Sequence, residues 1–266
     1  MYYAGVDIGA YNVKVMLLDG ELRPIAKSGA ECGAVYDAAA RLALERACCE
    51  AGIGVADVAD AVRTGIGNTG ASDCLGFRKE ALVSDITCQA RACSTLFPGC
   101  RTVIDIGGGS SKVASLDERG LCLRFAYSEK CAAGSGRFMQ IVANILEIGV
   151  EEIGPLSLLG DEPISFSTGC AVFAESDVIT KVGEGVSAAN ILAGMNLAIA
   201  SKIASLVKRV GYAPSCVMTG GAALNEGLVN AVGDALGTRP LVPASPEFSC
   251  AYGAALAAAA KSKRGL

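Results

Sequence analysis

Short runs of alternating apolar and polar residues open the chain, and they predict a strand-rich beginning. Strands are expected at Tyr2–Asp7, at Val13–Leu18 and near Pro24–Ser28. Helical spacing of apolar residues follows over Val35–Ala51, and a buried strand is expected over Ala61–Thr64. The pattern therefore predicts a first lobe with an antiparallel sheet and packed helices, closed before a helix over Asp85–Phe97.

The opening pattern then occurs a second time. An apolar run at Thr102–Ile106 leads through a glycine turn into a second run at Lys112–Leu116. In both places an Asp near the end of the first run is followed by glycine, in Asp7-Ile8-Gly9 and in Asp105-Ile106-Gly107-Gly108-Gly109. Such a repeat predicts two related lobes.

These glycine turns are typical of phosphate-binding loops. Glycine lets the backbone approach phosphate oxygens, and a carboxylate at the same place can hold hydrated Mg²⁺. A third glycine pattern is Val217-Met218-Thr219-Gly220-Gly221-Ala222-Ala223-Leu224-Asn225. Here an apolar strand leads into a Gly pair that opens a helix. This arrangement fits a turn packed against a nucleoside. One such pattern alone is equally typical of an ordinary tight turn, whereas three in this order favour a nucleotide site.

Two cysteines each come just before a helical stretch. They lie in Lys130-Cys131-Ala132-Ala133-Gly134-Ser135-Gly136-Arg137-Phe138 and in Ser167-Thr168-Gly169-Cys170-Ala171-Val172-Phe173-Ala174-Glu175-Ser176. A helix start favours an anionic thiolate, either as a reactive group or as a metal ligand. An iron–sulfur cluster usually takes four cysteines, so a symmetric homodimer would complete the set. The alternative is a pair of unrelated buried cysteines.

Composition narrows the classes of protein further. The 266-residue chain is 52% hydrophobic with a net charge of −4, which gives a core but no basic surface for nucleic acid. It contains no histidine, which excludes His-dependent triads and mixed Cys/His zinc sites. The Ala-rich stretch Ala251–Ala260 is too short to span a bilayer and predicts a packed C-terminal helix.

The chain has 12 cysteines and opens on a strand-like run, without the charged and apolar regions of a secretory signal. We therefore expect a cytoplasmic location and reduced thiols. Most cysteines are expected to be small buried residues, namely Cys32, Cys48, Cys49, Cys88, Cys93, Cys122 and Cys216.

The three glycine patterns together resemble the actin, sugar kinase and Hsp70 ATPase superfamily. The two cysteine motifs narrow this resemblance, together with two further runs, Ala143-Asn144-Ile145-Leu146-Glu147 and Val178-Ile179. With them the chain is similar to the ATP-dependent activators of 2-hydroxyacyl-CoA dehydratases and to the ATPase subunits of benzoyl-CoA reductase. These proteins form the BadF/BadG/BcrA/BcrD ATPase family. The resemblance implies an α/β, actin-like (ribonuclease H-like) fold with a nucleotide cleft between two related lobes. Lobe I would cover 1–97 and lobe II 98–250, with a C-terminal helix, 251–266, packing back on lobe I.

The resemblance also implies a function, that of an ATPase coupled to low-potential electron transfer. Cys131 and Cys170 of two subunits would ligate one shared [4Fe-4S] cluster, ferredoxin or flavodoxin would donate electrons, and a dehydratase or related double-cluster reductase would receive them. Asp7, Asp105 and Ser110 would act in Mg²⁺-dependent hydrolysis. ATP or ADP would be bound by Gly9, Ala10, Tyr11, Asn12, Lys14, Gly107, Gly108, Gly109, Gly134, Ser135, Gly220, Gly221, Ala222 and Asn225.

Two segments depart from the family pattern. Relatives commonly carry Gln-Asp after the paired glycines of the second loop, where this chain reads Gly107-Gly108-Gly109-Ser110-Ser111-Lys112. A Gln can orient an attacking water and a Gly cannot, so slow turnover is expected, or turnover that depends on Ser110. Many relatives also have Cys-His where this chain has Cys88-Gln89.

Two other functions remain as alternatives to an electron-transferring ATPase. One is a small-molecule kinase or polyphosphate phosphohydrolase of the same fold, with merely structural cysteines. The other is a non-enzymatic ATP sensor.

Overall fold

The computed structural model describes residues 1–33, 35–65, 75, 80–128, 135–166 and 171–262. The chain divides into two compact units, each with its own sheet. Unit 1 comprises Met1–Gly99, Glu118–Cys122 and Phe248–Leu266, and unit 2 comprises Cys100–Asp117 and Leu123–Glu247.

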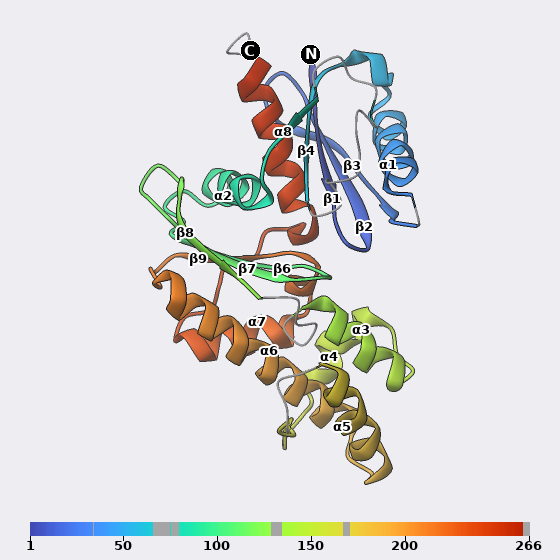
Figure 1. Cartoon of the computed structure of the whole chain (residues 1–266), viewed down its shortest axis with the longest axis vertical. Helices are drawn as coiled ribbons and strands as arrows, with labels where there is room; N and C mark the ends of the chain where they lie inside the picture. The colour runs from blue at the N-terminus through green and yellow to red at the C-terminus, as the bar shows by residue number, and fades with distance from the viewer. Residues whose placement is uncertain (34, 66–74, 76–79, 129–134, 167–170, 263–266) are drawn as a thin grey trace. The chain divides into compact units, whose positions relative to one another are not determined.

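Unit 1 is built on a five-stranded sheet in the order β3-β2-β1-β4-β5 (Figure 1). Its strands are β1 (Tyr2–Ile8), β2 (Asn12–Leu18), β3 (Pro24–Glu31), β4 (Val58–Thr64) and β5 (Glu80–Leu82). Its helices are α1 (Tyr36–Ala51), α2 (Asp85–Leu96) and α8 (Ser249–Ser262). β1, β2 and β3 pair antiparallel, whereas β4 and β5 extend the sheet in parallel from β1.

Helices cover both faces of this sheet, so the central strand β1 has buried apolar residues on both of its sides. Ala4, Val6 and Ile8 of β1 pack in the cluster that includes α1, and Tyr3 of the same strand packs in the cluster that includes α8. Gly5 lies directly under α8, where an added Cβ would overlap the backbone of Ala251. The C-terminal helix therefore packs on the N-terminal strand.

Unit 2 is built on a four-stranded sheet in the order β8-β7-β6-β9. Its strands are β6 (Thr102–Ile106), β7 (Ser111–Leu116), β8 (Cys122–Tyr127) and β9 (Cys216–Thr219). Its helices are α3 (Gly136–Ile145), α4 (Ile153–Ser157), α5 (Ala171–Gly183), α6 (Ala188–Val210) and α7 (Glu226–Leu236). β7 pairs antiparallel with β6, and β9 pairs parallel with it, as β2 and β4 pair with β1 in unit 1.

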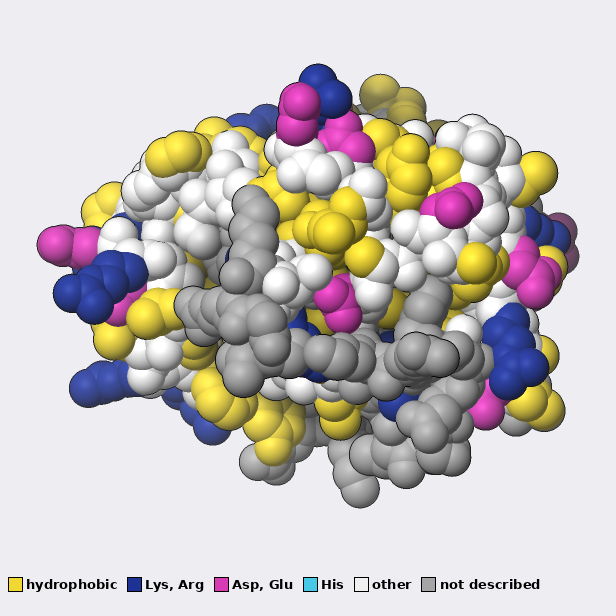
Figure 2. Space-filling view, turned by 90° about the horizontal axis from the view of Figure 1, so that it is seen from above, with side chains coloured by type: hydrophobic (Ala, Val, Ile, Leu, Met, Phe, Trp, Pro, Cys, Tyr) yellow, Lys and Arg dark blue, Asp and Glu magenta, His cyan; other side chains and the backbone are white. Residues whose placement is uncertain are grey.

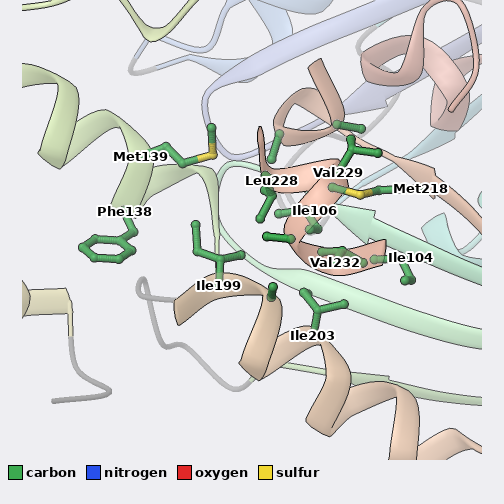
Figure 3. Packing of buried hydrophobic residues seen from close by; sticks show 14 of the residues in the cluster. Ile104, Ile106, Phe138, Met139, Ile199, Ile203, Met218, Leu228, Val229 and Val232 are labelled. Carbon is green, nitrogen blue, oxygen red and sulfur yellow. The ribbon is translucent and has the colours of Figure 1, made fainter. Parts of the chain in front are cut away.

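One face of the second sheet carries the core of unit 2 (Figure 3). Ile104 and Ile106 of β6 and Met218 of β9 lie against side chains of α6 and α7, with Phe138 and Met139 of α3 in the same cluster. Phe138 meets Phe166 edge to face, with ring centroids 5.5 Å apart. This core anchors the glycine turns that follow β6 and β9.

By length and composition alone, α6 could cross a membrane. Among the helices of the described residues, no other meets this criterion. Its inward residues Ile191, Met195, Ile199 and Ile203 are fully buried in the core of unit 2, and 56% of its most apolar window is buried. A central core helix has this composition for the same reason.

Several elements differ from the sequence expectations. β8 was not predicted, although Leu123, Phe125 and Tyr127 alternate along it, and these three large apolar residues are exposed. Cys49 was predicted to be buried and is exposed, and Cys32 and Cys122 are half-buried. The described cysteines Cys48, Cys88, Cys93, Cys100, Cys216 and Cys250 are buried.

Candidate functional site

The first glycine turn joins β1 to β2. The Gly9 N–H donates to the Asn12 carbonyl oxygen at 3.1 Å, which closes the turn and leaves Ala10 and Tyr11 at its tip. Asp7 and Lys14 are direct neighbours across the antiparallel pair. The sequence-predicted residues of the first phosphate loop therefore lie together in unit 1.

The second glycine turn has the same construction in unit 2. The Gly107 N–H donates to the Ser110 carbonyl oxygen at 3.0 Å, and Asp105 and Lys112 are cross-strand neighbours. Gly108 and Gly109 are exposed at the tip of the turn. Lys112 was not among the predicted site residues, although its position in the repeat corresponds to Lys14.

A parallel strand adds a Thr-Gly pair beside each of these aspartates. Thr64 of β4 is in register with Asp7 of β1, and Thr219 of β9 is in register with Asp105 of β6. Each Thr is followed by a glycine with positive φ, Gly65 or Gly220. A Cβ added to either glycine would lie 2.3 Å from a backbone carbonyl oxygen, that of Ile8 or Ile106, and 2.7 or 2.8 Å from the neighbouring Asp Oδ1, so only glycine fits beside the strand end and its carboxylate.

The third glycine pattern forms a short 3-10 turn at Gly221–Leu224, and α7 begins after it. Asn225 caps α7, because its Oδ1 accepts from the Leu228 N–H at 3.1 Å. Its Nδ2 donates to Asn196 Oδ1 at 2.8 Å, and the Asn196 amide donates to Ser157 Oγ. This buried network fixes Asn225, the residue that ends the Gly221–Leu224 turn, and the contact of Asn225 with a nucleoside stays a prediction.

Cys32 is a residue of this region that the sequence analysis missed. Its N–H donates to the Tyr11 carbonyl oxygen at 2.7 Å, and its thiol donates to the Gly9 carbonyl oxygen at 3.3 Å. Burial raises the pKa of this thiol, and the nearby Lys14 charge opposes that effect. Cys32 is therefore a neutral thiol that stabilises the first glycine turn.

The second glycine turn is also attached to the chain on both sides of Cys131. Before that cysteine, the Ser128 N–H donates to the Ser111 carbonyl oxygen at 2.8 Å, and the Ser111 N–H donates to Ser128 Oγ at 3.0 Å. After it, the N–H groups of Gly136 and Arg137, in the first turn of α3, donate to the Gly107 and Gly108 carbonyl oxygens at 2.9 and 3.0 Å. Four backbone-linked hydrogen bonds thus connect the phosphate-type turn to this segment.

The predicted residues Cys131, Gly134 and Cys170 lie outside the described residues. Helices do follow both cysteines. α5 begins at Ala171, immediately after Cys170. α3 begins at Gly136, after the Cys131 segment, with the buried Ser135 directly before it. Within the described ranges, no three Cys, Asp or Glu side chains are grouped as a metal ion requires. The two cysteine segments therefore stay the candidate metal ligands.

Charged side chains do not gather into a basic surface on the face in Figure 2. Lys and Arg side chains there are interspersed with Asp and Glu among the described residues. That distribution agrees with the net charge of −4.

The model of the BadF/BadG/BcrA/BcrD ATPase family matches residues 4–258, which includes both glycine turns and the Thr-Gly pairs. The chain belongs to this family. Component A of the (R)-2-hydroxyglutaryl-CoA dehydratase of Acidaminococcus fermentans is 32% identical, with a TM-score of 0.92 over 99% of both chains. The activator of the 2-hydroxyisocaproyl-CoA dehydratase from Clostridium difficile, solved with bound ADPNP, is 36% identical, with a TM-score of 0.92 over 100% of this chain and 98% of that one.

The fold of this family member is the predicted α/β, actin-like ATPase fold. A ROK hexokinase from Thermus thermophilus shares it over 100% of both chains with a TM-score of 0.53, at only 18% identity. In this chain both sheets share one arrangement, with an antiparallel strand on one side of β1 or β6 and a parallel strand on the other.

Proposed function

We propose that this family member is an ATP-dependent activator that delivers single electrons to a 2-hydroxyacyl-CoA dehydratase or a related double-cluster reductase. The chain matches two solved relatives over nearly their whole length. One is described as component A of a 2-hydroxyacyl-CoA dehydratase, and the other is described as an activator of such a dehydratase. The chain would act as a cytoplasmic homodimer, with ferredoxin or flavodoxin as its electron donor.

The observation that carries this proposal is the attachment of the Cys131 segment to the second glycine turn. Phosphate binding would draw on backbone N–H groups of that turn, while its Gly107 and Gly108 carbonyls hold the start of α3. Ser111, at the other end of the turn, holds Ser128. A change in the turn would therefore be passed to both ends of the segment that contains Cys131.

The residues around the two turns fit ATP or ADP with Mg²⁺. The glycine turns offer backbone N–H groups, and Lys14 and Lys112 offer positive charge near each turn. Asp7 and Asp105 are oxygen donors of the kind that Mg²⁺ prefers, and they would order the metal and the attacking water. Gly109 stands where relatives carry Gln, so turnover would be slow or would depend on Ser110.

The two cysteines fit a [4Fe-4S] cluster shared by two copies of the chain. Thiolates are the usual ligands of such clusters, and the helix dipole at the start of α5 favours a thiolate and added negative charge next to Cys170. When bound, the cluster would supply one electron of low potential to the partner enzyme.

Iron analysis tests this proposal. The protein is purified without oxygen, and iron, sulfide and the electron paramagnetic resonance of the reduced state are measured for the wild type, Cys131→Ala and Cys170→Ala. We expect about four irons per two chains in the wild type, and loss of the cluster signal in both variants, because each change removes two of the four ligands in a dimer.

Cys49→Ala is the matched control, because Cys49 is an exposed cysteine on α1 with no predicted ligand role. It should retain the full iron content. A wild type that takes up no iron during anaerobic reconstitution, yet hydrolyses ATP or polyphosphate, would contradict the proposal and favour the kinase or phosphohydrolase alternative.

A further inference from the structure

Thr219 makes a contact with Asp105 that depends on the parallel pairing of β6 and β9. Its Oγ1 lies 3.3 Å from Asp105 Oδ1 and 3.4 Å from the Ile104 carbonyl oxygen. Thr219 is completely buried and Asp105 is 9% exposed, so water does not compete freely for this contact. The hydroxyl has one proton to donate, and an ionised carboxylate is the stronger of the two acceptors.

The same pair of residue types occurs at the equivalent place in unit 1. Thr64 is in register with Asp7, and Gly65 follows it as Gly220 follows Thr219. Both glycines have positive φ, at 98° and 85°, and both leave space next to an Asp Oδ1. Thr64 Oγ1, however, is buried without a hydrogen-bond partner among the described residues, so the bond from a threonine hydroxyl to the aspartate belongs to Thr219 and Asp105 of unit 2.

We infer that Thr219 is a positioning residue for Asp105, and that Gly220 after it leaves the space in which this carboxylate lies. This inference rests on the proposed role of Asp105 in ATP hydrolysis. A carboxylate on a Cβ can rotate about χ2, and one fixed donor selects one orientation of its two oxygens. The glycine removes the side chain that would otherwise occupy the same space.

Hydrolysis by Thr219→Val and Thr219→Ser tests the inference. Valine keeps the branched shape and removes the hydroxyl, so we expect kcat for ATP hydrolysis to fall by about 10- to 100-fold with KM within about threefold. The acid limb of the kcat profile should move to higher pH, because a lost donor disfavours the ionised carboxylate. Serine keeps the hydroxyl and should restore kcat to within about threefold of the wild type.

Thr102→Val is the matched control. Thr102 is a buried threonine of the same strand as Asp105, but its hydroxyl binds the backbone of Ala213 at 2.8 and 3.2 Å. This variant should lose thermal stability while keeping kcat and its pH profile. Equal loss of kcat in Thr102→Val and Thr219→Ser would overturn the inference, because it would show a general structural effect.

Asp105→Asn separates this inference from the proposed function. Loss of hydrolysis in Asp105→Asn together with wild-type kcat and pH profile in Thr219→Val would overturn only the role of Thr219. Unchanged hydrolysis in Asp105→Asn would refute the role of Asp105 itself, and with it the positioning role of Thr219.

Discussion

Gly220 and Gly237 both have positive φ, but only Gly220 lies against a candidate catalytic carboxylate. Gly220, at φ 85° and ψ 168°, is in a region that only glycine adopts readily, and we expect Gly220→Ala to lower the free energy of unfolding by about 2–3 kcal/mol. The added Cβ would also lie 2.3 Å from the Ile106 carbonyl oxygen and 2.8 Å from Asp105 Oδ1, which would move both the end of β6 and the carboxylate, so ATP hydrolysis should be abolished. Urea unfolding and steady-state kinetics measure the two effects.

Gly237→Ala is the control at the residue scale. Gly237 ends α7 in the left-handed region, and an added Cβ there meets nothing within 4 Å. Alanine should cost about 1 kcal/mol of stability through backbone strain alone, with kcat unchanged. If both variants hydrolyse ATP at the wild-type rate, the space next to Asp105 has no functional role.

At the scale of elements, α7 is held by a cap that also belongs to a buried network. Asn225→Ala removes the acceptor of the Leu228 N–H and leaves the buried Asn196 amide oxygen without its donor. We expect the free energy of unfolding to fall by about 2–4 kcal/mol, because the cap is lost and a buried group is left unpaired.

Ser187→Ala is the control. It removes an exposed cap of α6, which accepts from the Asn190 N–H, and it should lower the free energy of unfolding by only about 1 kcal/mol. Equal losses in the two variants, measured by denaturant unfolding, would show that the Ser157–Asn196–Asn225 network adds no stability.

At the scale of the whole molecule, buried thiols predict a loss of stability in alkaline solution. Burial raises the pKa of Cys88 and Cys216 to about 12 and that of Cys100 to about 11. Thiols in the unfolded chain ionise near pH 8.5, so above that pH the folded state binds more protons than the unfolded state. The free energy of unfolding should therefore fall as pH rises from about 9 toward 12, by up to about 1.4 kcal/mol per pH unit for each thiol.

Cys216→Ala isolates one of these contributions. Its stability should depend less steeply on pH between 9 and 11 than that of the wild type, even if the variant is less stable at every pH. Exposed Cys49 serves as the control, because Cys49→Ala should leave the slope unchanged. Identical slopes for the wild type and Cys216→Ala would show that the buried thiol does not contribute. Urea midpoints at several pH values measure these slopes.

The sequence alone determined the fold class and the ends of the two glycine turns. Asp and glycine at the end of an apolar run are local signals, and the structure has β1, β2, β6 and β7 where those runs predicted strands. The helices after Cys170 and near Gly136 follow from helical spacing and are likewise local. Periodicity reports which side of an element is apolar, and this was sufficient for these elements.

Only the tertiary structure decided which distant residues meet. Thr219 reaches Asp105 because β9 joins β6 in parallel, and Thr64 lies beside Asp7 because β4 joins β1 in the same way. The exposed apolar side of β8 and the exposure of Cys49 also depend on what packs against each element. Strand register and burial arise from the whole fold, because parallel neighbours are linked by long crossovers whose pairing no short sequence window contains.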